Sequence, residues 1–134
     1  MIKDIVIFTI LVLLIDSVYL KNIVGEFSKM VNKIQGSHID TNMQAAAVVY
    51  VAMVVVWYVF IWSEMKNKGL KQSVIRAGIL GVCTYAIFDF TNMAIFKDYR
   101  LDLSIMDSVW GGVLFALCTY LVHLIRLYVW LQYV

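Results

Sequence analysis

Four long stretches of apolar residues dominate this chain and restrict it to one kind of fold. A helix needs about 20 mostly apolar residues to cross the hydrocarbon core of a bilayer. Four segments meet that requirement, at residues 5–24, 43–63, 73–96 and 105–130. Backbone polar groups inside a bilayer must be hydrogen-bonded within the protein, so apolar segments of this length form helices. The sequence predicts an all-α polytopic membrane protein, in which residues 1–134 form a single bundle of four transmembrane helices.

The composition supports the same fold class. Of the 134 residues, 63% are hydrophobic and 15% are charged, and the mean hydropathy is +0.84. Ordinary globular chains are about 45–50% apolar and about 25% charged. We therefore expect the lipid bilayer to be the main partner of this chain. The net charge of +2 is too small to suggest a nucleic-acid partner, and none is predicted.

The segments between the predicted spans indicate how the chain is oriented. Six Lys and Arg residues fall on the side of the loop at 64–76, and five fall on the opposite side. Because basic residues favour the cytoplasmic side, this excess predicts a multi-pass protein with both termini in the cytoplasm. Apolar residues at helical spacing, with lysines beside them, also predict a short amphipathic helix at 26–35, lying along the membrane surface.

Several polar residues interrupt the apolar spans at a common depth. A helix rises about 1.5 Å per residue, so position along a span gives depth. Asp16, Asp89, Asn92 and Asp107 all fall in the half of the membrane nearer the first and third loops, called the distal half here. The helix faces that bear three of them also carry Tyr19, Tyr85 and Trp110. With Tyr50, at the distal end of the second span, and Thr91, beside Asn92, these side chains form the expected supporting pocket. We expect an inward-facing polar pocket, with Asp16 and Asp89 facing each other across the first and third helices.

An ionisable residue inside a membrane usually faces a partner or water and marks a functional site. Asp16, Asp89, Asn92 and Asp107 are therefore candidates for binding a proton or a cation, since burial and a neighbouring carboxylate both favour protonation. The leading hypothesis is a small proton- or cation-linked transporter or channel. A four-helix monomer has little room for a wide pore, so this hypothesis also predicts a homo-oligomer.

Two other functions are open. In the first alternative, the protein is a non-catalytic scaffold or interaction protein, and its Asp and Asn side chains only hold the helices together. In the second, it is an accessory protein or an enzyme of lipid metabolism. The sequence contains no nucleophile–base pair, glycine-rich phosphate loop or cofactor signature, so we predict no catalytic residues and no cofactor. Oxygen ligands from Asp, Asn and Thr suit a hard cation, but their spacing matches no recognised metal loop, and a metal site stays open.

Three short motifs carry a resemblance to a known family. They are Ile15-Asp16-Ser17-Val18-Tyr19-Leu20; Asp89-Phe90-Thr91-Asn92 with Tyr85, Ala94 and Lys97 around it; and Asp107-Ser108-Val109-Trp110-Gly111. Over nearly its whole length the chain resembles small four-helix membrane proteins, mainly bacterial, that are catalogued as a domain of unknown function. The family tends to have Trp where this chain has Tyr19, and the absence of proline from the loops is a second departure. The resemblance implies a fold and no activity.

Overall fold

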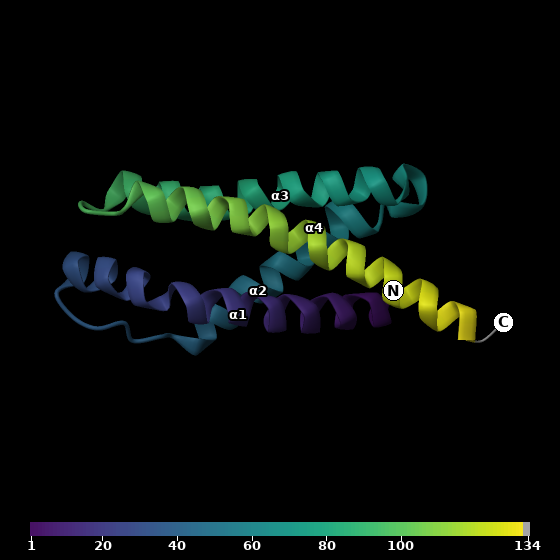
Figure 1. Ribbon diagram of the computed structural model, residues 1–134, viewed down its shortest axis with the longest axis horizontal. Helices are drawn as coiled ribbons and strands as arrows, with labels where there is room; N and C mark the ends of the chain where they lie inside the picture. The colour runs from purple at the N-terminus through teal and green to yellow at the C-terminus, as the bar shows by residue number, and fades with distance from the viewer. Residues whose placement is uncertain (133–134) are drawn as a thin grey trace.

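Four long helices make up the computed structural model, which describes residues 1–132 (Figure 1). Their bounds are α1 (Ile2–Gln35), α2 (Met43–Trp57), α3 (Met65–Ile95) and α4 (Leu101–Gln132), and α2 continues into a π-helical turn, η1 (Tyr58–Trp62). Within residues 1–132 the structure contains no strand. The prediction of an all-α bundle is confirmed.

Three of the helical segments are long and apolar enough to cross a membrane: Met43–Trp62, Met65–Ile95 and Leu101–Gln132. Between 17% and 33% of the residues in their apolar windows are buried inside the protein, so most of that apolar surface is left for lipid. Residues 5–24 of α1 are not among these three, and their crossing stays a prediction from the sequence. Multiple spans agree with a multi-pass protein in a lipid bilayer.

Helix α1 extends well beyond the predicted span at 5–24. Residues 26–35 continue the same helix rather than forming a separate amphipathic one, because Gly25 keeps a helical backbone and Glu26 pairs with Lys29 across one turn at 2.7 Å. The helix ends at Gly36, whose left-handed φ of 74° suits glycine and turns its N–H toward the Asn32 carbonyl. The extension reaches the distal end of the molecule, where segments 36–42 and 96–100 also lie (Figure 1).

Two buried tryptophans flank the π-helical turn η1: Trp57 ends α2, and Trp62 ends η1. The wider hydrogen bond of η1 runs from the Ser63 N–H to the Tyr58 carbonyl, and the extra residue changes which side chains face inward. Trp57 stacks on Phe8 of α1 at 3.8 Å between ring centroids. The indole N–H of Trp57 donates to Thr119 of α4 at 2.9 Å, so this one side chain joins three helices.

Helices α3 and α4 lie side by side and form the most extensive helix–helix interface (Figure 1). Glycines allow the approach: a Cβ at Gly81 would overlap the carbonyl of Gly111, and a Cβ at Gly111 would overlap the ring of Tyr85. Small residues at a crossing let backbones come close, which gives dispersion contacts that lipid cannot replace. Helix α3 begins at Met65, earlier than the predicted 73, but Gly69 with φ 75° and ψ 167° separates its first turn from the rest.

Candidate functional site

Asp16 joins all four helices through hydrogen bonds. It lies on α1 and is 5% exposed. Its Oδ2 accepts from the Tyr50 hydroxyl of α2 at 2.7 Å, and its Oδ1 accepts from the Trp110 indole of α4 at 2.9 Å. The Tyr85 hydroxyl of α3 donates to the same Oδ1 at 3.4 Å. Both carboxylate oxygens of Asp16 therefore have donors, and the side chain acts as a tie between helices.

A chain of contacts leads from Asp16 toward the distal end. Trp110, which donates to Asp16, stacks on Tyr19 with 4.5 Å between ring centroids. The Tyr19 hydroxyl then donates to Asp107 Oδ1 of α4 at 2.8 Å. Trp110, Tyr19 and Asp107 thus connect Asp16 with Asp89, the two aspartates expected to face each other directly.

Asp89 is more deeply buried than Asp16 and less well paired. It is 1% exposed, and its Oδ1 accepts from the Tyr99 hydroxyl at 2.9 Å. Its Oδ2 is buried without a donor. Burial, and then the bond to Asp89, raises the pKa of the Tyr99 phenol, so Tyr99 keeps its proton and donates.

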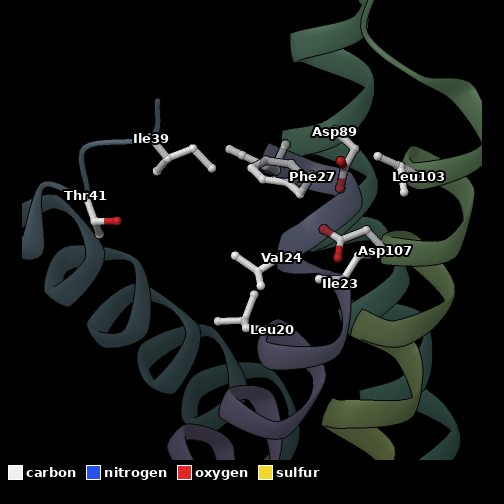
Figure 2. A pocket seen from close by; sticks show the side chains of 10 residues that line it. Leu20, Ile23, Val24, Phe27, Ile39, Thr41, Asp89, Leu103 and Asp107 are labelled. Atoms are coloured by element: carbon white, nitrogen blue, oxygen red, sulfur yellow. The ribbon is translucent and has the colours of Figure 1, made fainter. Parts of the chain in front are cut away.

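The carboxyl groups of Asp89 and Asp107 point toward one another (Figure 2). Both carboxyls face the same cavity, and with both ionised no donor reaches Asp89 Oδ2. Two neighbouring carboxylates removed from water are costly when both are charged, so one proton shared between them lowers the free energy. The geometry thus suits a carboxyl pair that holds one proton.

A cavity of about 360 Å³ lies against this pair. Asp89 and Asp107 form part of its wall, and α1 and the 36–42 segment supply much of the rest (Figure 2). Its lining is Leu20, Ile23, Val24, Phe27, Ile39, Thr41, Phe88, Asp89, Leu103 and Asp107. Apart from the two carboxyls and Thr41, the lining is apolar, and it includes no Lys, Arg or His. A volume of this size falls in the range of small-molecule sites, about 300–1,000 Å³.

The comparison with known families agrees with this architecture. The model of a family described as "Predicted membrane protein (DUF2177)" matches residues 1–124. The chain belongs to this family. The resemblance noted in the sequence is confirmed, and the protein is an integral membrane protein. Neither a curated protein nor a solved structure matched the chain.

The fold of this DUF2177 protein places the predicted site residues in two groups. Asp16 shares hydrogen bonds with Tyr50, Tyr85 and Trp110, whereas Asp89 and Asp107 share the cavity, and Asp16 does not line it. Asn92 is half-buried beside the Tyr99 hydroxyl. Thr91 is exposed. It does not line the cavity and does not belong to the hydrogen-bonded group around Asp16.

Two parts of the site were missed by sequence reasoning. Tyr99, the donor to Asp89, lies in the short connection after α3, and no pattern in the sequence marks it. The apolar cavity lining from α1 reads as ordinary span residues. Within residues 1–132, no group of three or more His, Cys, Asp or Glu side chains is arranged to hold a metal ion.

Proposed function

We propose that this protein is a small proton-linked membrane transporter in which Asp89 and Asp107 hold the coupling proton. The observation that carries the proposal is the buried Asp89 Oδ2, which has no donor and faces the carboxyl group of Asp107. A proton between the two groups supplies the missing donor and removes one of two adjacent charges. Every other polar contact of Asp89 leaves that oxygen unpaired.

The position of the pair suits uptake and release of a proton. Asp107 is half-buried, and both carboxyls line a cavity that opens at the surface. A proton can therefore reach the pair from the distal side without breaking the hydrogen bonds around Asp16. Because the same carboxyls line the cavity, whatever occupies the cavity changes the free energy of holding that proton.

The hydrogen bonds of Asp16 favour a structural role for that side chain, which is to hold the helices together. That carboxylate accepts bonds from α2, α3 and α4, and neither of its oxygens lacks a donor. We assign the scaffold role to Asp16 and the proton-linked role to Asp89 and Asp107. A protein with only the structural role would keep both groups as fixed clasps and move no protons.

Proton flux into liposomes tests the proposal. Purified protein is reconstituted into vesicles that contain a pH-sensitive dye, and a pH gradient or a membrane potential is imposed. We expect acidification of the lumen to be faster with wild-type protein than with Asp89→Asn or Asp107→Asn. The amide of Asn is similar in size to a protonated carboxyl, so both variants retain the packing and lose the exchangeable proton.

Asp98→Asn is the matched control. Asp98 is exposed in the segment after α3, and its φ of 67° is one that Asn also adopts, so the same chemical change falls outside the site. This variant is expected to conduct protons like the wild type. Equal flux in wild-type and Asp89→Asn vesicles, or no wild-type flux under either gradient, would contradict the proposal.

A further inference from the structure

We infer that the cavity beside Asp89 and Asp107 binds a protonated primary amine that carries an apolar body, and that the amine exchanges with the shared proton. The inference rests on the proposed function, because it assigns a substrate class to the same carboxyl pair. The substrate class follows from the apolar cavity walls and from the unpaired oxygen of Asp89.

The balance of charges and hydrogen-bond donors around the pair favours an ammonium group. Asp107 faces Asp89 from α4, while Tyr99 and Tyr19 each donate to one oxygen of the pair and carry no charge. No Lys, Arg or His lines the cavity, so no positive side chain there offsets the two carboxyls. An ammonium group brings both a positive charge and three N–H donors. One of these can supply the donor that Asp89 Oδ2 lacks.

The apolar walls of the cavity favour a ligand with an apolar body. Leu20, Ile23, Val24 and Phe27 follow one another along α1 and line the cavity opposite the carboxyls, with Phe88 of α3 also in the lining. Such walls would exclude a small hydrated cation, which needs oxygen ligands or water around it. They suit a hydrocarbon or aromatic body attached to the ammonium group.

The depth of the cavity favours an amphipathic ligand. Leu20 and Val24 are exposed at the distal end of the predicted span at 5–24, and Ile39 and Thr41 belong to the adjoining loop. The cavity therefore lies near the boundary between hydrocarbon and water. Amphipathic molecules concentrate at that boundary with the charged end toward water.

The exchange balances without any covalent change. In the resting state the pair holds one proton and has a net charge of −1 by arithmetic, since one of two carboxyls is neutral. When R–NH₃⁺ enters, the shared proton leaves to water, and two carboxylates with one ammonium again sum to −1. The charge of the site is the same in both states, so neither state leaves an extra charge buried.

Calorimetric titration of the purified protein in nanodiscs tests the inference, with hexylamine as the probe at neutral pH. We expect hexylamine to bind and to release one proton per amine, measured by repeating the titration in buffers of different ionisation enthalpy. Hexyltrimethylammonium has the charge but no N–H donor, so it is expected to bind about tenfold more weakly. Empty nanodiscs correct for partition into lipid.

Two variants locate the binding. Val24→Trp places a large side chain in the cavity from an exposed position that tolerates it. Asp89→Asn removes the negative charge and replaces one acceptor oxygen with an N–H₂ donor. Both are expected to abolish saturable hexylamine binding, while Asp98→Asn leaves it unchanged. Circular dichroism of each variant confirms that the helices are retained.

The outcomes separate this inference from the proposed function. Hexylamine binding that persists in both variants would overturn the inference. Equal binding of hexanol would also overturn it, because the occupant would then be a neutral lipid chain. Proton flux without amine binding would support the transporter proposal and contradict the inference that the substrate is an amine. Amine binding with proton release but no flux would support the site and contradict transport.

Discussion

Asp16 accepts hydrogen bonds from three other helices, whereas Asp89 keeps one buried oxygen without a donor. Both side chains are nearly inaccessible to solvent, so burial alone does not separate their roles. Their neighbours separate the two roles. Asp16 is surrounded by hydroxyl and indole donors, whereas Asp89 faces a second carboxyl group. A fully paired carboxylate stabilises packing, while a half-paired one has capacity for a proton or a ligand.

The structural role of Asp16 leads to a stability prediction. Asp16→Ala leaves Tyr50, Tyr85 and Trp110 without their acceptor. Hydrogen bonds between membrane helices average roughly 0.6 kcal/mol each, so the loss of three costs about 2 kcal/mol. Unfolding titrated with SDS in mixed micelles measures this change.

Two further variants serve as comparisons for the loss of stability in Asp16→Ala. Tyr50→Phe removes a single donor and is expected to cost about 0.6 kcal/mol. Asp98→Asn weakens only an exposed ion pair with Lys33 at 3.2 Å, so it is expected to change the stability by about 1 kcal/mol or less. A wild-type unfolding curve for Asp16→Ala would show that the hydrogen-bonded group around Asp16 does not hold the helices together.

At the scale of the elements, the α3–α4 crossing is the most constrained contact. A Cβ at Gly81 would overlap the backbone of Gly111, which cannot move aside as a flexible side chain can. Gly81→Ala is therefore expected to destabilise the fold by about 1–3 kcal/mol, as overpacking does in a tight core. Thermal unfolding followed by circular dichroism measures the effect.

Gly78→Ala is the matched control, one turn away on the same helix. A Cβ there would lie 3.7 Å from the nearest atoms of α4, an ordinary contact distance. Because alanine favours helix over glycine by about 0.5–1 kcal/mol, this variant is expected to be neutral or more stable. Similar losses for both variants would indicate that close backbone contact at Gly81 is not what α3 and α4 require.

An ion-pair network on the surface joins the distal part of α1 to Arg100, the residue just before α4. Glu26 accepts from Lys29 and from Arg100, each at 2.7 Å, and these two bonds hold the pKa of Glu26 below its ordinary value of 4.5. A lowered folded-state pKa means that the contribution is present above pH 4.5 and is lost as the pH falls through the lowered value. Acidification should therefore loosen the 26–35 part of α1 first.

Hydrogen-exchange protection factors of residues 26–35 measure this at about pH 6 and about pH 3. We expect protection to fall at the lower pH in the wild type, while Glu26→Gln is already less protected at the higher pH and changes little. A pH response of the same size in Glu26→Gln would assign the effect to other carboxylates.

The sequence predicted the elements better than their connections. Apolar runs of the right length placed all four helices, because lipid requires both the length and the composition. The continuous helix through Gly25 and the π-helical turn at 58–62 were missed. At Gly25 the helix continues on its own backbone and the Glu26–Lys29 pair, and the π-helical turn rests on one wider backbone hydrogen bond. No pattern in the sequence marks either feature.

At the scale of the whole molecule, the predicted site residues divide between the cavity and the hydrogen-bonded group around Asp16. Asp89 and Asp107 line the same cavity, whereas Asp16 does not. The expected direct pairing of Asp16 with Asp89 depended on how the helices rotate, and Trp110 and Tyr19 set that rotation by stacking. The cavity depends on residues from three helices and a loop, so no single stretch of sequence could indicate it.

The central claim is that the intact protein in lipid holds one proton between Asp89 and Asp107. Infrared spectroscopy of the protein in lipid at neutral pH tests this directly, because the carbonyl stretch of a protonated carboxylic acid is separate from the carboxylate bands. We expect this band in the wild type and in Asp98→Asn, and we expect its loss in Asp89→Asn and in Asp107→Asn. A wild-type spectrum without the band, or a band that persists in both site variants, would contradict the account.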